Sequence, residues 1–177
     1  MLVSAMKPGR RGHTLAEMMF VLAIAAILLC LAMPAMRGML QQHRLSATVN
    51  DFFAAVTLAR SEALRQGVQV VLLPAGASWS SGWVVALDRN GNLQLDAGDE
   101  VLYSHGPPST ELTISGSFSD NRLPYLAYDP GGRSRTKSGG AQAGAWQFNC
   151  GAHRRKIIIN FLGRPRTCNP DLDKTSC

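Results

Sequence analysis

One uninterrupted apolar run, Met18–Met33, lies close to the N-terminus and constrains the fold more than any other feature. With its flanks, this run is about as long as a helix must be to cross a hydrocarbon core of ~30 Å. It contains no charged residue and leaves no polar face, which a helix packed on a soluble core would normally have. We therefore assign residues 13–36 to a membrane-spanning helix.

A basic leader precedes this run and ends in a glycine, because Lys7, Arg10 and Arg11 are followed by Gly12. In a secretory signal peptide, the cleavage site follows the apolar region, which is then removed. A cut after Gly12 would instead keep the apolar helix in the mature protein. The order of parts therefore indicates a leader over residues 1–12 and a retained N-terminal helix.

The six residues from Gly12 read Gly-His-Thr-Leu-Ala-Glu and resemble the type IV prepilin motif Gly-Phe-Thr-Leu-(Ile/Val)-Glu. His13 and Ala16 depart from the common residues. The resemblance implies that a prepilin peptidase cleaves between Gly12 and His13 and that His13 is then N-methylated. A plain membrane anchor without processing is the alternative interpretation.

Two further residues gain an assembly role from the same resemblance. A carboxylate at the edge of a membrane helix costs a few kcal/mol and suggests a function. For Glu17, the family implies pairing with the N-terminal amine of a neighbouring subunit, and Pro34 occupies the usual helix-kinking position. Alternatively, Glu17 is an interfacial residue that stays among the lipid headgroups.

Beyond the apolar run, the hydrophobic period changes twice. From 37 to 66, apolar residues recur at steps of three and four, which predicts an amphipathic helix with one face on a core, ending before Gly67. From 67 to 177, short alternating segments separated by Gly, Pro, Asn and Ser predict an antiparallel β-rich domain. The fold class is α+β, a pilin-like lollipop with a helical stem. The expected strands are 68–73, 83–87, 101–105, 112–115, 125–128, 145–149 and 156–161.

This arrangement resembles the GspH/FimT branch of pilins and pseudopilins. The supporting residues are the helix segment 58–63, the acidic segment 88–102 and a late phenylalanine followed by Gly163-Arg164. The resemblance implies a filament subunit held in the bacterial inner membrane by a single pass, with its head in the periplasm. Its partners would be other pilins or pseudopilins in a helical filament, and the prepilin peptidase.

Charge is separated along the chain, whose formal net charge is +6. The segment 88–129 holds seven acids and two bases, whereas 133–166 holds eight bases and no acid. Arginines beside glycines can approach phosphates and donate paired hydrogen bonds. The separation therefore suggests a face that binds a polyanion. The candidate DNA-binding residues are Gly163, Arg164, Arg166, Arg133, Arg135, Lys137, Arg154, Arg155 and Lys156.

Gly163-Arg164-Pro165-Arg166 also matches the Gly-Arg-x-Arg motif of FimT-type minor pilins that bind DNA during uptake. By this resemblance the partner is double-stranded DNA, bound without sequence preference during natural transformation. We place residues 131–140 and 163–166 in loops, and 152–156 in a turn before a strand. One alternative is a solvated basic face that meets anionic lipid or an acidic pilin neighbour. The other is a structural H-type pseudopilin of type II secretion.

The cysteines beyond the membrane run lie in a compartment that permits disulfides. We expect a bridge between Cys150 and Cys168 that ties the last strands together, with Cys177 as a substitute for either partner. Asp88–Glu100 spaces its oxygen side chains like a calcium loop but lacks the EF-hand glycine and glutamate positions, so a β-hairpin is favoured. No motif nominates a catalytic residue, a metal or a cofactor, and we expect no enzyme activity.

Overall fold

The computed structural model describes residues 14–173, 175 and 177, with the backbone alone for residues 31–35. The chain divides into two compact units, Met1–Met39 and Leu40–Cys177. Helix α1, Leu15–Gln66, contributes residues to both units.

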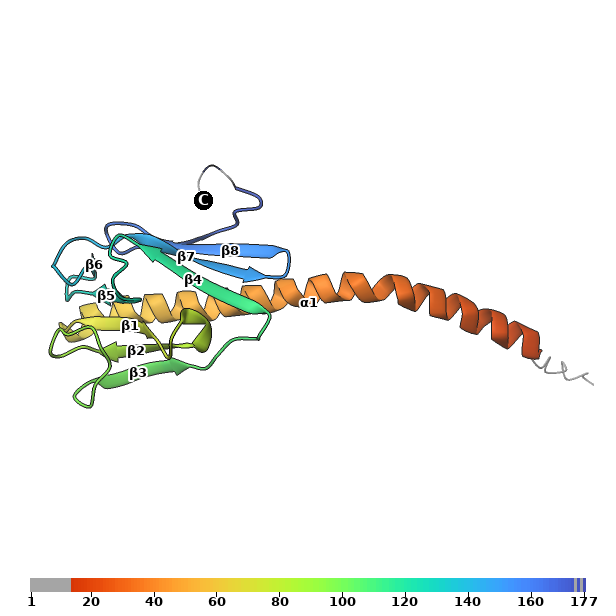
Figure 1. The fold of residues 1–177 in the computed structure, drawn as a ribbon, viewed down its shortest axis with the longest axis horizontal. Helices are drawn as coiled ribbons and strands as arrows, with labels where there is room; N and C mark the ends of the chain where they lie inside the picture. The colour runs from red at the N-terminus through yellow and green to blue at the C-terminus, as the bar shows by residue number, and fades with distance from the viewer. Residues whose placement is uncertain (1–13, 174, 176) are drawn as a thin grey trace, which may run out of the picture. The chain divides into compact units, whose positions relative to one another are not determined.

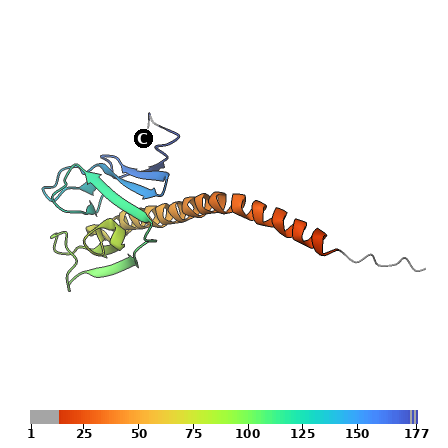
Figure 2. The same ribbon diagram turned by 45° about the vertical axis from the view of Figure 1, so that its right-hand side comes forward.

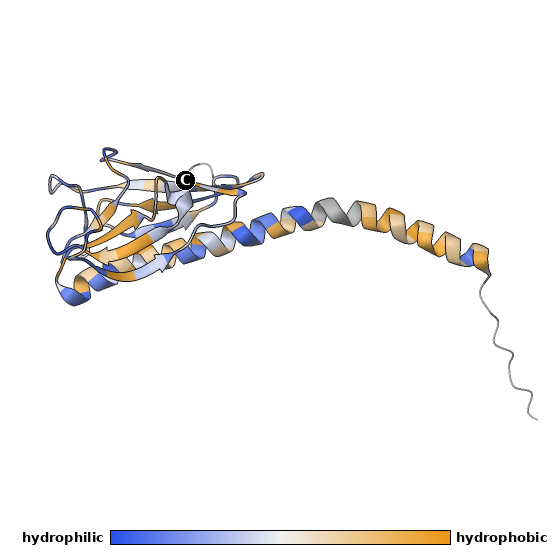
Figure 3. Cartoon of the chain, turned by 60° about the horizontal axis from the view of Figure 1, so that its bottom comes forward, coloured by the Kyte–Doolittle hydropathy of each residue, from blue (hydrophilic) through white to orange (hydrophobic). Residues whose placement is uncertain are grey.

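The described part of the first unit is the beginning of α1. Thr14 caps this helix, because its Oγ1 accepts a hydrogen bond from the backbone N–H of Glu17 at 3.3 Å. The apolar side chains that follow are exposed, with Phe20 at 70% and Ile27 at 62%, and they make this stretch the most apolar part of α1 (Figure 3). Within the described residues, no helix combines the length and hydropathy of a membrane span.

The head is built on the second half of α1. Six side chains on one face of this half are each at most 4% exposed. They are Leu45, Val49, Phe52, Val56, Ala59 and Ala63. These positions recur at the helical period, so they form one apolar stripe. The helix ends where Gly67 adopts a φ of 66° and its N–H donates to the carbonyl of Ala63 at 3.0 Å.

Two antiparallel sheets pack against this stripe (Figures 1 and 2). The five-stranded sheet has the order β3-β2-β1-β5-β6, and the four-stranded sheet has the order β4-β7-β8-β9. A short 3-10 helix, η1 (Trp79–Ser81), connects β1 to β2. The strands are β1 Val70–Pro74, β2 Trp83–Leu87, β3 Glu100–His105, β4 Leu112–Phe118, β5 Leu126–Tyr128, β6 Ser134–Arg135, β7 Gly144–Cys150, β8 His153–Ile159 and β9 Pro165–Cys168. The predicted α+β class is confirmed.

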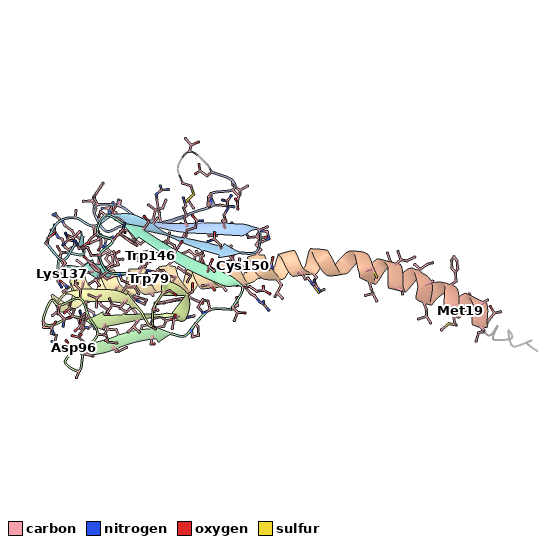
Figure 4. All side chains as sticks on the ribbon, in the orientation of Figure 1. Met19, Trp79, Asp96, Lys137, Trp146 and Cys150 are labelled. Atoms are coloured by element: carbon pink, nitrogen blue, oxygen red, sulfur yellow. A yellow bond between two sulfur atoms is a disulfide. The ribbon has the colours of Figure 1, made fainter. Side chains whose placement is uncertain are left out.

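Phe52 joins the helix to both sheets. Its ring centroid lies 4.9 Å from that of Trp83 in the five-stranded sheet and 4.8 Å from that of Trp146 in the four-stranded sheet. Trp79 of η1 stacks edge-on against Trp146 at 5.4 Å, and both are labelled in Figure 4. Such aromatic contacts bury a large apolar area, so this cluster fixes the sheets on α1.

The basic C-terminal third contains more strand than we predicted. Arg154 and Arg155, expected in the turn before the strand, lie within β8, because β7 continues to Cys150 and pairs with β8 as far as His153. Arg166, expected in a loop, lies in β9, where it pairs with Ile158. Ser134–Arg135 pair with β5 as β6. These strands depend on partners distant in sequence, so local composition did not reveal them.

The predicted Cys150–Cys168 bridge is wrong, because Cys168 is bonded to Cys177. Cys150 ends β7 with its side chain in the core, whereas Cys168 lies in β9, with β8 between the two strands. Strands two places apart are separated by about 10 Å, beyond the ~7 Å limit of a disulfide. Cys150 is a free thiol, and its burial raises its pKa.

The acidic segment after β2 is the connection of a β-hairpin, because β2 and β3 pair antiparallel. Its carboxylates bind groups of the segment itself. Asp88 accepts hydrogen bonds from the N–H groups of Gly91 at 2.7 Å and Leu93 at 2.9 Å. Asp96 accepts from the side-chain amides of Asn90 and Asn92, both at 2.8 Å. These oxygens therefore shape the connection.

Candidate nucleic-acid interface

Two glycine-containing turns from different sheets meet at one end of the head. Gly163, in the turn between β8 and β9, has a φ of +75°. A Cβ on Gly163 would lie 2.7 Å from the backbone nitrogen of Ser134 and 2.8 Å from Cε1 of Tyr128. Only glycine allows this approach, which places the Gly-Arg-Pro-Arg turn against β5 and β6.

A buried tyrosine fixes the contact. The Tyr128 hydroxyl donates a hydrogen bond to the carbonyl of Gly163 at 2.8 Å, and its burial raises its pKa well above the ordinary value. Tyr128 therefore remains protonated and keeps its donor at physiological pH. The bond connects the two sheets at the point where the turns meet.

Helix α1 also contacts the site where the two turns meet. Nε of Arg60 donates to the carbonyl of Gly132 at 2.9 Å, and Leu64 packs closely on Gly132. Sequence reasoning did not include Arg60, because only the tertiary contact with Gly132, 72 residues away, gives it this position. We call Arg60, Arg133 and Arg164 the basic end of the head.

The turn that carries Arg164 is held by its first residue. Oδ1 of Asn160 accepts hydrogen bonds from the N–H groups of Leu162 at 3.0 Å and Arg164 at 2.9 Å. The Gly163 N–H donates to the Asn160 carbonyl at 2.9 Å. Hydrogen bonds within the turn therefore already order the backbone of the motif. It does not have to become ordered when a ligand binds.

Asp129 organises the turn that carries Arg133. Its carboxylate accepts hydrogen bonds from Arg133 N–H at 3.0 Å and from Nε of Arg135 at 2.7 Å. Burial pushes the pKa of Asp129 upward, but these hydrogen bonds outweigh burial and hold the pKa below its ordinary value. Arg135 is thus neutralised within the head, whereas Arg133 points its side chain into solvent.

Apart from Lys137, which is exposed in the connection after β6, the remaining candidate bases lie elsewhere or have partners. Arg154 pairs with Asp171, Arg155 donates to the carbonyl of Arg154, and Lys156 reaches the Cys177 carbonyl at 3.5 Å. Arg154 and Arg155 lie near the start of β8, and Arg164 follows its other end. The structure therefore gathers only part of the predicted set.

Arg133 and Arg164 differ from these bases in having exposed, available charges. Among the residues that the structure describes, neither guanidinium makes an ion pair or a hydrogen bond, and both side chains are exposed. Arg166 is exposed within β9, and Arg164 lies directly before this strand. Two arginines beside tight turns can donate paired hydrogen bonds to phosphate oxygens.

The processing residues and the assembly residues belong to the N-terminal unit. Gly12 and His13 lie outside the described residues. Glu17 lies in the first turn of α1, and the backbone of α1 continues through Pro34, whose side chain is not described.

Two family models match the sequence. One is described as Type II transport protein GspH and matches residues 48–163. The other, the prokaryotic N-terminal methylation motif, matches residues 7–33. The pilin-like protein PilA1 of Thermus thermophilus is 36% identical over 165 residues, covering 89% of this chain and 97% of that protein.

Two solved structures share the fold. The type IV minor pilin FimU of Pseudomonas aeruginosa PAO1 matches with a TM-score of 0.56 and 17% identity, over 73% of this chain and 92% of FimU. The minor pseudopilin EpsH from the type 2 secretion system of Vibrio cholerae matches with a TM-score of 0.54 and 8% identity, over 72% of this chain and 98% of EpsH. At these identities, the likeness concerns the fold alone.

Proposed function

This chain belongs to the GspH family, and from that premise we propose that it is a minor pilin whose basic end binds double-stranded DNA without sequence preference. As a pilin or pseudopilin, it is a structural subunit of a type IV pilus or of a type II secretion filament, not an enzyme. DNA binding would assign it to the pilus and to DNA uptake.

The observation that carries the proposal is the meeting of the two turns at Gly163. It brings Arg133 and Arg164 to one place from different sheets, with exposed guanidiniums that bind no carboxylate in the described part of the head. Because the hydrogen bonds of Asn160 and Asp129 already fix both backbones, little backbone entropy is lost on binding. The Gly-Arg-x-Arg resemblance supports the same ligand.

Contacts of this kind bind the phosphate backbone of DNA rather than recognise the edges of its bases. An arginine fork donates two parallel hydrogen bonds to a phosphodiester but carries no sequence information. Each neutralised phosphate releases counterions, so affinity must fall steeply as salt rises. The interface is thus suited to retaining any incoming duplex.

The N-terminal residues supply the filament context of this proposal. Prepilin peptidase would cleave after Gly12, and His13 would then be N-methylated, which the match to the methylation motif over residues 7–33 supports. Glu17 and Pro34 would act in assembly. The apolar start of α1 would anchor the subunit in the inner membrane before assembly, with the head in the periplasm.

A second candidate function is a structural subunit of a type II secretion filament that binds no DNA. The family description, Type II transport protein GspH, favours this role. Under it, the basic end would contact a neighbouring subunit. The two functions differ in whether the head binds DNA, which is directly measurable.

The DNA-binding test uses the full chain in nanodiscs of zwitterionic lipid and a fluorescent duplex. We expect binding that weakens with salt, and about tenfold or greater loss in Arg133→Ala with Arg164→Ala. The slope of log K against log salt should shrink by about two, one for each lost phosphate contact. Arg154→Ala with Arg155→Ala, at the other end of β8, is the matched control and should bind nearly as wild type. No binding by the wild-type chain at low salt would refute the proposal.

A further inference from the structure

The turn between β8 and β9 exposes an aromatic ring close to an available arginine. Phe161 is 68% exposed, and Leu162 beside it is 52% exposed. Oδ1 of Asn160 holds this turn in one conformation by accepting hydrogen bonds from the N–H groups of Leu162 and Arg164. The turn therefore presents a planar apolar ring and a cation on one ordered backbone.

A groove of about 720 Å³ includes Phe161 in its lining and lies on the face of the four-stranded sheet opposite α1. Trp146 and Phe148 of β7 contact Phe52 of the helix, so the residues that alternate with them point outward. The strand register aligns the outward residues of the sheet in two rows. One row is Ser117, Ala145, Ile158 and Arg166, and the other is Ser115, Gln147 and Lys156.

The groove combines apolar surface, hydrogen-bonding groups and positive charge. Ile158 supplies apolar surface beside Phe161, while Gln147 and the two serines of the rows supply groups that donate and accept hydrogen bonds. Among the described residues that line the groove, Lys156 is the one charged side chain, and none is acidic. Such a surface suits a planar ligand that carries hydrogen-bonding groups and is linked to an anion.

Paired DNA cannot stack a base on Phe161. Within a duplex, each base is stacked between its neighbours, so that base edges and phosphates are what a protein contacts. An unpaired base exposes its flat faces, and stacking on an aromatic side chain stabilises its binding whatever its sequence. An arginine beside the ring can hold the phosphate of the same strand through paired hydrogen bonds.

We propose that Phe161 and this groove bind unpaired bases of single-stranded DNA, while Arg164 binds the adjoining phosphate. The inference rests on the proposed function, because the same basic end binds the phosphates of a duplex. It adds a discrimination that the arginines alone do not provide. A single strand makes a stacking contact that an intact duplex lacks, so Phe161 determines specificity for the form of the DNA.

Two fluorescent probes on the full chain in nanodiscs of zwitterionic lipid test the inference. One probe is a short oligothymidine, which is single-stranded, and the other is a relaxed circular duplex, which has no ends. Phe161→Ala should weaken oligothymidine binding about five- to hundredfold and change binding of the circle by less than about twofold. Phe161→Trp, which keeps an aromatic face, should retain oligothymidine binding. Arg133→Ala with Arg164→Ala should weaken binding of both probes.

Leu172→Ala is the matched control, because it removes an apolar side chain that is 85% exposed and lies outside the lining of the groove. It should change the binding of neither probe. Unchanged oligothymidine binding in Phe161→Ala, or equal weakening of both probes, would overturn the inference while leaving duplex binding established. Absence of wild-type binding to the circle at low salt would instead refute the proposed function, so the two failures are separate results.

Discussion

At the scale of single residues, Asp129 shows how one carboxylate both builds and limits the basic end. It accepts hydrogen bonds from the backbone of Gly131 at 2.9 Å and of Arg133, and it pairs with Arg135. The turn that presents Arg133 depends on it, yet the same group removes Arg135 from the available charge. A count of basic residues therefore overstates what the head offers to an anion.

Asp129→Asn tests this dependence. The amide oxygen can still accept from the backbone, but its NH₂ group faces Nε of Arg135, so we expect the free energy of unfolding to fall by about 2 kcal/mol. The pKa of Asp129 in the folded protein lies below its ordinary value of 3.8. The carboxylate therefore adds to the free energy of unfolding above pH 3.8, and this contribution is lost as the pH falls through the folded pKa. Denaturant titrations between about pH 7 and pH 3 should therefore show the wild-type advantage shrink in acid. An advantage that grows in acid would contradict this assignment.

At the scale of elements, the hairpin of β8 and β9 is positioned by close packing on the other sheet. Gly163 approaches Ser134 and Tyr128 more closely than any side chain permits. The glycine of the Gly-Arg motif is therefore structural: it sets where Arg164 stands relative to Arg133.

Gly163→Ala should lower the free energy of unfolding by about 2–4 kcal/mol, because it adds a steric clash to the cost of a positive φ. Gly139→Ala is the control, since Gly139 has a similar φ of +83° but open space around its Cβ position. It should cost only about 1 kcal/mol. Thermal and denaturant unfolding of the two variants compare them directly. Equal losses would mean that the packing at Gly163 is unimportant.

At the scale of the whole molecule, the two units present different surfaces. The head buries its apolar side chains around Phe52, whereas the described start of α1 exposes nearly all of its own. Apolar surface of this extent requires lipid or neighbouring helices to cover it. A subunit whose apolar helix leaves lipid and packs against neighbouring helices during assembly satisfies this requirement.

Glu17→Ala tests the assembly role that we propose for this carboxylate. The mature protein should still begin at a methylated His13 by mass spectrometry, but it should be absent from sheared filaments. Glu111→Ala, which removes an exposed carboxylate of the head, is the control and should be incorporated normally. An intact leader in cells with active prepilin peptidase, or unchanged incorporation of the Glu17 variant, would contradict the proposed role.

The sequence by itself determined what local periodicity encodes. The 3.6-residue stripe through Phe52 and Val56 identified the helix of the head, and the two-residue alternation located most strands. The family was also readable from the leader and the late Gly-Arg. Each of these signals lies within a few consecutive residues, so no knowledge of the tertiary structure is needed to detect it.

Only the tertiary structure decided which distant residues meet. Cys168 bonds Cys177 because β8 separates β9 from Cys150, and Arg60 joins the basic end because α1 passes beneath Gly132. Arg133 and Arg164 come together across two sheets, while Arg154 is carried to the other end of β8. Sheet order and inter-sheet packing arise from non-local burial, and residues equally basic in sequence are separated by it in space.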